Sequence, residues 1–295
     1  MQKLAAGQQC SFIRFFGKIR GTQADYYVVE ATAEGGEEPV EEEENPEAKE
    51  EEKDPNQEEK GTGVNKYTYF VTNSPFSAWS RLPDLSPTQI SAARGIKFVF
   101  SGDLESDIIC NPFFFGKEKH LLRAQIARIV HSTELVPKGS YKLNEESARE
   151  IDQVVPEEDS KVEPLPSTLG AAKLSAWVHF NASILNNNRT THLDPPEEAP
   201  EGFEGEYDPE AERKKIEEAD PFEPRLKGIE GDGKIKMGGG MKQAPWVVRL
   251  VGDSTEYSDN RGQKVCHGVV VVRSLTWPGA FTLYKNGQQK SIYVG

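Results

Sequence analysis

The chain has 295 residues, of which 36% are hydrophobic and 28% charged, and its formal net charge at pH 7 is −13. This acidic balance disfavours nucleic-acid binding, because affinity for phosphate backbones needs a basic patch. No run of about eighteen continuous apolar residues is present, so no membrane span is predicted. The N-terminus lacks a signal-peptide hydrophobic region, and Cys10, Cys110 and Cys266 show no CxxC spacing. We therefore expect a cytosolic protein with reduced thiols.

The N-terminal region is expected to form antiparallel β-strands. Apolar and polar residues alternate at Phe12, Arg14, Phe16 and Lys18. GTQAD then supplies turn residues, and YYVVEA is aromatic and β-branched. KYTYFVTN continues the β pattern after a long interruption. A three-stranded antiparallel meander is the natural prediction.

The interruption is an acidic segment. From Glu34 to Lys60 it holds fourteen acidic residues against three lysines, which accounts for −11 of the net charge. Low hydrophobicity with dense like charge predicts disorder, so residues 32–65 are interpreted as a disordered acidic insertion. Gly61 and Gly63 favour a flexible linker. A solvated spacer and a surface that engages or repels charged partners are both open interpretations.

Two further stretches lack periodic apolar residues. Residues 144–166 are predicted to be a linker, and residues 194–244 a disordered linker. The remaining residues suffice for one compact core, so residues 1–295 are interpreted as a single discontinuous domain.

Helices are predicted in the middle of the chain. Ser86 is the expected N-cap of a short helix, with Pro87 at its first position, Gln89 as the reciprocal capping partner and Gly95 at its end.

The next three segments are assigned by their apolar spacing. Residues 96–100 are expected to form a strand, and residues 120–131 fit both helical spacing and alternation, with strand favoured. Residues 173–185 are predicted to be helical, because Leu174, Trp177, Val178 and Leu185 share one helical face.

The C-terminal region is rich in β-strand patterns. PWVVRLVG, CHGVVVVRSLTW and AFTLYKNGQQKSIYV each predict strands, and Asn286-Gly287 is a strong hairpin signal. The fold class expected for the whole chain is α+β: a mainly antiparallel β-sheet with a few short helices and long disordered acidic or Gly/Pro-rich loops.

No motif for catalysis or cofactor binding is present. The sequence has no HExxH, GxSxG or P-loop pattern, and its five histidines form no recognisable constellation. We therefore expect no enzyme, no cofactor and no metal site. Phe113, Phe114 and Phe115 are predicted to be core residues, although exposure would indicate a protein interface.

Several ordered blocks together resemble one family. They are FIRFFGKIRGTQADYYVVE, GTGVNKYTYFVTNSP, LPDLSPTQISAARGIKFVFSGDL, LLRAQIARI, WVHF, APWVVRL and VVVVRSLTWPGAFTLYKNGQQKSIYVG. This set resembles the radial spoke head 4/6 family of motile cilia and flagella. Members of the family generally carry a longer region before the first block, so a fragment, a short isoform or a shortened family member is expected.

The resemblance implies a non-enzymatic component of the axonemal radial spoke head, within the cytoskeleton of the cilium or flagellum. It implies contact with the central pair that regulates dynein-driven beating, other spoke head subunits as partners, and a dimer with itself or a paralogue. A soluble acidic escort for basic proteins is the alternative. Exposed aromatics such as Trp277 and Tyr284 could bind neighbouring subunits. The residues expected to matter for structure or interfaces are Arg14, Lys18, Arg123, Arg273 and Trp277.

Overall fold

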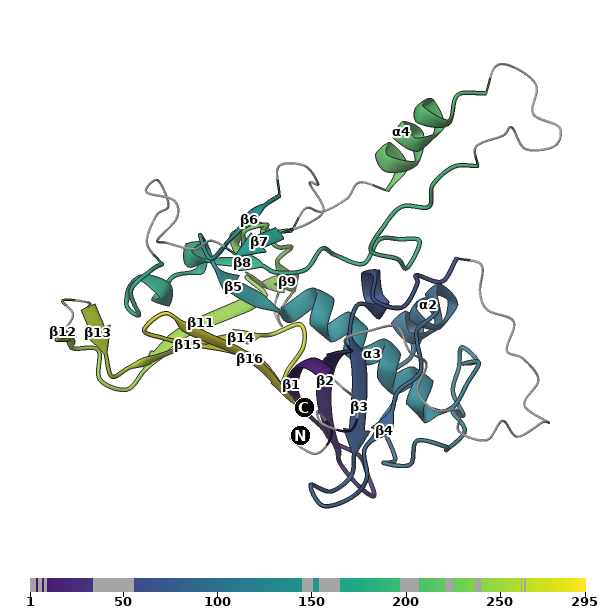
Figure 1. The fold of residues 1–295 in the computed structure, drawn as a ribbon, viewed down its shortest axis with the longest axis horizontal. Helices are drawn as coiled ribbons and strands as arrows, with labels where there is room; N and C mark the ends of the chain where they lie inside the picture. The colour runs from purple at the N-terminus through teal and green to yellow at the C-terminus, as the bar shows by residue number, and fades with distance from the viewer. Residues whose placement is uncertain are drawn as a thin grey trace. The chain divides into compact units, whose positions relative to one another are not determined.

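Figure 1 shows the helices and strands of the chain, which divides into two compact units. The first, unit 1, consists of residues 1–15, 21–127 and 184–222, and the second, unit 2, of residues 16–20, 128–183 and 223–295. The expectation of a single domain stays a prediction. The computed structural model describes residues 4, 7, 10–33, 56–144, 151–153, 165–196, 207–220, 225–236, 240–260, 262 and 264–295.

The sheet strands of unit 1 follow one another in sequence. They are β1 (Cys10–Ile19, of which the residues up to Phe15 belong to this unit), β2 (Tyr26–Ala33), β3 (Thr68–Thr72) and β4 (Ser80–Arg81), and each is the neighbour of the next. β2 pairs with β3, and β3 with β4, in antiparallel register. The strand order of the expected meander is confirmed.

The short helix predicted from its capping signals is confirmed. It is α2 (Pro87–Gly95), in which the Ser86 side chain accepts from the backbone of Gln89 and the Gln89 side chain accepts from the backbone of Ser86. The reciprocal pairing satisfies two of the backbone amides that a helix start leaves without partners.

The strand favoured for residues 120–131 is wrong, because these residues lie in helix α3 (Glu118–Thr133). Apolar residues on several sides of this helix are buried, which explains why one-sided helical spacing did not stand out. At 16 residues the element is also much longer than an ordinary strand.

The strand predicted at residues 96–100 is wrong as well. Ile96 and Phe100 are buried while Lys97 and Val99 are exposed, a burial pattern like that of a half-buried strand. Only Phe100 makes a bridge, with Gly21, and no strand is formed there. Alternation records which side chains are covered, but a strand also needs a neighbour for its backbone.

The predicted linkers contain structured residues. Residues 32–65 include the end of β2 and the 3₁₀ helix η1 (Gly63–Asn65), and residues 144–166 include β7 (Ile151–Gln153). Residues 194–244 include α4 (Pro209–Ala219), whose N-cap Asp208 accepts from Glu210 N. The predictions at 34–55, 145–150, 154–164, 197–206, 221–224 and 237–239 lie outside the described residues.

The sheet of unit 2 has the strand order β11-β14-β15-β16, and β16 pairs in parallel with Gly17 and Lys18 of β1. All other pairs in this order are antiparallel, which confirms the α+β class with a mainly antiparallel sheet. Its strands are β11 (Trp246–Val251), β14 (Val269–Ser274), β15 (Ala280–Lys285) and β16 (Gln288–Val294).

The remaining elements of unit 2 are short. They are β5 (Leu135–Pro137), β6 (Tyr141–Leu143), β7, η2 (Gly170–Ala172), η3 (Leu174–Ala176), β8 (Trp177–His179), η4 (Ile229–Gly231), β9 (Ile235–Lys236), β10 (Lys242–Gln243), β12 (Glu256–Ser258) and β13 (Lys264–Cys266). They pair as β5 with β8, β6 with β7, β9 with β10 and β12 with β13.

The turn between β15 and β16 matches its sequence signal. Asn286 and Gly287 have φ values of 47° and 82°, the left-handed conformations required at both central positions of a type I′ turn. The predicted hairpin is confirmed.

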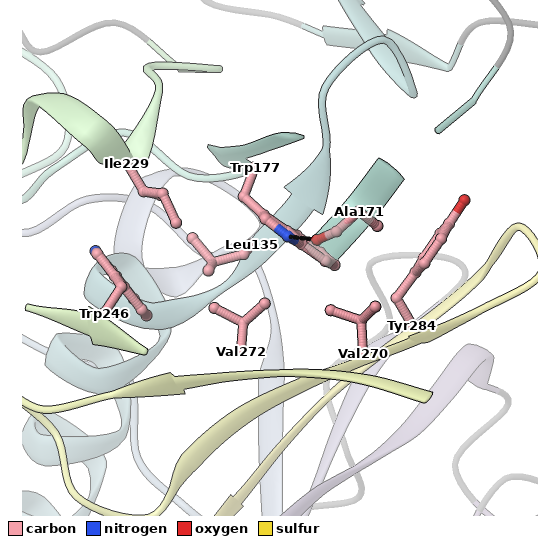
Figure 2. Close-up of a cluster of buried hydrophobic side chains, with 8 residues drawn as sticks. All are labelled: Leu135, Ala171, Trp177, Ile229, Trp246, Val270, Val272 and Tyr284. Atoms are coloured by element: carbon pink, nitrogen blue, oxygen red, sulfur yellow. Dashed lines mark hydrogen bonds between the residues drawn. The ribbon is translucent and has the colours of Figure 1, made fainter. Parts of the chain in front are cut away.

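The core of unit 2 lies on one face of this sheet (Figure 2). Trp177 is completely buried, its Nε1 donates to the carbonyl of Ala171 at 2.8 Å, and its ring lies edge-on to Tyr284 at 5.8 Å between centroids.

The helix predicted at residues 173–185 is wrong, since Trp177 and Val178 belong to β8. Tyr284 is buried rather than exposed. The cluster comprises Leu135, Ala171, Trp177, Ile229, Trp246, Val270, Val272 and Tyr284.

Adjacent valines of β14 test which face is the core. Val272 is 1% exposed and belongs to the core cluster with Trp177 (Figure 2). Val271 is partly exposed and points to the opposite face, because successive side chains of a strand alternate. We expect Val272→Ala to lower the free energy of unfolding by about 2 kcal/mol and Val271→Ala by less than about half of that. Urea unfolding of both variants measures this. Equal losses would contradict the assignment of the faces.

Candidate functional site

A chain of buried polar contacts runs through unit 1. It begins at Glu30 on β2, whose side chain is 1% exposed. This carboxylate accepts from Arg14 Nη2 at 2.9 Å and from the Tyr69 hydroxyl at 3.0 Å. The buried charge is thus both paired and hydrogen-bonded, as burial of a carboxylate requires.

Arg123 of α3 continues this polar chain. Its guanidinium carbon lies 4.6 Å from the centroid of the Tyr69 ring, and its Nη2 donates to the carbonyl of Val64 at 2.7 Å. The side chain is fully buried, and this burial lowers the pKa of the guanidinium. A desolvated cation gains more from an aromatic face and a carbonyl than an exposed one. Arg14 and Arg123, both expected from the sequence to matter for structure or interfaces, therefore belong to one network.

The polar chain ends at Glu58, which sequence reasoning placed in the disordered insertion. Asn65 Nδ2 donates to the carbonyl of Glu58 at 2.8 Å. The Glu58 carboxylate is buried and accepts from the amides of Val64 at 2.8 Å and Thr190 at 3.0 Å, and from the hydroxyls of Thr190 and Thr191 at 2.9 and 3.0 Å. Glu58 therefore joins residues 56–65 to residues 184–196 of the same unit.

One signal could have distinguished Glu58 from the acidic residues before it. Gly63 adopts φ +51°, and a Cβ there would lie 2.2 Å from the Glu58 carboxyl carbon. A glycine required at that position marks an ordered turn, whereas the sequence was interpreted as a flexible linker. That interpretation is wrong at Gly63.

Glu118 forms a second buried hub in unit 1 that the sequence did not reveal. It is completely buried at the start of α3 and accepts from the Tyr26 hydroxyl at 2.7 Å, the Ser101 hydroxyl at 2.8 Å and the Gly102 amide at 2.9 Å. Burial first, and then the hydrogen bond to Glu118, raise the pKa of Tyr26. A carboxylate at a helix N-terminus is also favoured by the helix dipole.

An exposed aromatic loop precedes α3. Residues 107 and 117 form an antiparallel bridge, and Phe114 is buried at 1% exposure. Phe113 and Phe115 are 64% and 79% exposed, and their rings meet edge-on at 4.8 Å between centroids. The prediction of core positions is right for Phe114 and wrong for its neighbours, because exposure alternates along these three residues. We call residues 107–117 the aromatic loop.

The other three predicted residues belong to unit 2. Lys18 is half-buried and pairs through its backbone with Val294. Arg273 is exposed on β14, and half-buried Trp277 lies under the Arg128 guanidinium at 5.1 Å. The importance expected for all five residues stays a prediction.

A half-buried carboxylate links three segments of unit 2. Asp232 accepts from His179 Nε2 at 2.9 Å and from Trp246 Nε1 at 2.6 Å. Burial acts to raise the pKa of Asp232, but the hydrogen bonds from His179 and Trp246 outweigh burial, so the pKa is lowered.

Within the described residues, no group of three or more His, Cys, Asp or Glu side chains is placed to hold a metal ion. None of the helices in the described part of the chain has the length and apolar character needed to cross a bilayer. The features that the described residues do present are buried polar networks and exposed surfaces.

Comparison with known families identifies the kind of protein. The family model of the radial spokehead-like protein matches residues 1–59 and 52–295. The chain belongs to this family. The family resemblance drawn from the sequence is confirmed. Radial spoke proteins are components of the axoneme of cilia and flagella, which agrees with the localisation expected from the sequence.

Three relatives illustrate the similarity. Radial spoke head protein 6 homolog A of Mus musculus is 33% identical over all of this chain and 45% of its own length. Radial spoke head protein 4 homolog A of Homo sapiens is 33% identical over 98% of this chain and 42% of its length. Flagellar radial spoke protein 4 of Chlamydomonas reinhardtii is 31% identical over 96% of this chain and 57% of its length. The chain thus spans about half of each relative, and none of the three names is that of an enzyme.

Gly63 tests the anchoring role of Glu58 in this radial spokehead-like protein. Gly63→Ala must adopt a left-handed conformation, at a cost of about 1–2 kcal/mol, and also displace the Glu58 carboxylate. Displacement leaves the buried amides of Val64 and Thr190 without their acceptor, for a further loss of about 1–3 kcal/mol. Hydrogen exchange of these two amides should accelerate.

Gly61→Ala is the matched control, because Gly61 also has positive φ but open space around its would-be Cβ. It should cost only the conformational part and leave the Thr190 amide protected. Equal exchange at that amide in both variants would contradict the anchor.

Asp232 predicts a pH dependence of stability. Because its folded-state pKa is lowered, its contribution is present above the unfolded pKa of about 4 and is lost as pH falls through the folded value. Asp232→Asn should therefore lower the free energy of unfolding by about 1–3 kcal/mol at pH 7 and by less at pH values near 3. Urea unfolding at both pH values measures this. A difference that is constant with pH would refute it.

Proposed function

We propose that the chain is a non-catalytic subunit of the axonemal radial spoke head, which contributes to head assembly and to the contact with the central pair that regulates dynein-driven beating. The observation that carries the proposal is the family match over the whole chain, together with relatives named as radial spoke head proteins. Its expected partners are other spoke head subunits, including a second copy or a paralogue.

The geometry of unit 1 supports a role in assembly. The buried polar chain and Glu118 fix β2, β3 and α3 against one another through charge-assisted hydrogen bonds, which favours a rigid part rather than a moving one. The aromatic loop projects Phe113 and Phe115 from this support. Exposed aromatic side chains on a rigid base are typical of protein interfaces, where they contribute large area at low entropic cost.

The acidic sequence at residues 34–55 supports the contact with the central pair. The described residues that flank it are Ala33, at the end of β2, and Asn56. The Asn56 carbonyl accepts a hydrogen bond from Arg189 at 2.8 Å. A dense run of negative charge repels acidic surfaces and engages basic ones transiently. The soluble acidic escort remains the competing function, since the same charge suits a basic client.

Fractionation of axonemes separates the two functions. The protein is tagged at its native locus, ciliated cells are extracted with detergent, and axonemes are washed with high salt. A spoke head subunit is expected to stay with the axonemes. A protein that leaves entirely with the detergent extract would contradict the proposal and favour the escort.

Two variants then test the aromatic loop. Phe113→Ala combined with Phe115→Ala should reduce retention in the axoneme without changing the unfolding midpoint of the purified chain, because both side chains are exposed. Phe76→Ala is the matched control, since Phe76 is 98% exposed in unit 1 but lies outside the loop. Retention equal to the wild type would show that the loop is not an assembly contact.

A further inference from the structure

The sheet of unit 2 has a second face, opposite its core. Residues directly across antiparallel strands share a face, so the pairings define its rows. One row joins Arg249, Val271, Leu283 and Lys290. A second joins Val247, Arg273, Phe281 and Ile292. These rows alternate with Val270, Val272 and Tyr284, which point to the core (Figure 2).

This surface, which we call the basic face, combines apolar and cationic side chains. Its strand residues, all of which the structure describes, include no Asp or Glu: they are Val247, Arg249, Val251, Val269, Val271, Arg273, Phe281, Leu283, Lys285, Gln288, Lys290, Ile292 and Val294. The two arginines and two lysines are exposed, and the central apolar residues are partly exposed. The basic face thus has an apolar centre flanked by four positive charges.

The four cations are available to a partner. None of Arg249, Arg273, Lys285 and Lys290 forms an ion pair with any residue in the described part of the chain. Since the chain as a whole carries −13, four unneutralised cations on one sheet face without a single carboxylate run against its composition. Charge complementarity of this kind selects partners and raises association rates.

We propose that the basic face binds an acidic amphipathic segment of a partner polypeptide. Apolar side chains of that segment cover Val271, Leu283 and Phe281, and its carboxylates pair with the flanking arginines and lysines. The inference rests on the proposed function in one respect: in a spoke head subunit, the partner is another component of the spoke.

The apolar centre favours this occupant over other anions. Nucleic acid would meet only four cations on a strongly acidic protein and would leave the valines and Leu283 uncovered. The chain's own residues 34–55 supply carboxylates but only Val40 as a large apolar residue. A segment with both kinds of side chain satisfies both features of the face.

Binding is measured with defined peptides and the full purified chain. The probe is a fluorescent synthetic peptide of alternating leucine and glutamate, compared with one of leucine and glutamine, with polyglutamate and with a peptide of residues 34–55. Fluorescence anisotropy should show saturable, salt-sensitive binding of the leucine–glutamate peptide and clearly weaker binding of the other three. Equal binding of polyglutamate or of the 34–55 peptide would overturn the proposal, as would failure of the leucine–glutamate peptide to bind.

Charge reversal locates the site. Arg249→Glu combined with Lys290→Glu changes both ends of one row and should weaken the affinity at least about tenfold. Lys242→Glu combined with Lys264→Glu makes the same change in net charge at exposed lysines outside the face, and should leave the affinity within about twofold. Circular dichroism verifies that both are folded. Equal loss in the two variants would refute the assignment of the face.

Two competitors test other classes of ligand. Duplex DNA and vesicles of anionic phospholipid should not displace the leucine–glutamate peptide, and displacement by either would overturn the proposal. The peptide assay is independent of localisation: a protein that binds the peptide but is absent from axonemes would refute the proposed function alone, whereas an axonemal protein that fails to bind would refute this inference alone.

Discussion

Unit 1 depends on the contacts of the buried Arg123 side chain. Its guanidinium lies over the Tyr69 ring and donates to the carbonyl of Val64. These contacts join helix α3 to strand β3 and to the turn that follows the acidic segment. Through the Tyr69 hydroxyl they continue to Glu30 and Arg14. A buried cation is costly to leave without partners, because hydrogen bonds and an aromatic face then no longer offset its desolvation. The same constraint explains why Arg123, Tyr69, Glu30 and Arg14 form one connected network.

The sequence predicts local features of this chain well. The start of helix α2 is indicated by Ser86 and Gln89, and the turn between β15 and β16 by Asn286-Gly287. Both signals could be interpreted because each acts within a few residues. Features that depend on distant neighbours were missed. Residues 120–131 could form a strand or a helix until burial on several sides was known, and Trp177 fitted a helical face although its partners are Ala171 and Tyr284. Glu58 resembled the acidic residues before it, since only its contacts with Thr190 and Thr191 distinguish it. Arg14 and Arg123 were named separately, and nothing in the sequence connects them.

Each unit combines a fixed interior with a surface that is not used by its own core. In unit 1 the aromatic loop is held by buried Phe114 and by the bridge between residues 107 and 117, and Phe113 and Phe115 project from it. In unit 2 one face of the sheet covers Trp177, and the other carries the cations and the apolar residues of the basic face. Surfaces of this kind suit a protein whose work is to hold neighbours, since rigid supports reduce the entropy lost when a partner binds. The family membership and these surfaces support the same account of a structural spoke subunit.

The central claim is that the chain is a built-in part of the spoke head. The most direct measurement is cryo-electron tomography of axonemes from cells that lack the chain, compared with wild type and with cells in which it is restored. The account predicts that density is lost from the spoke head while the stalks remain, and that restoring the chain restores the density. Spoke heads of unchanged density in cells without the chain would contradict the account.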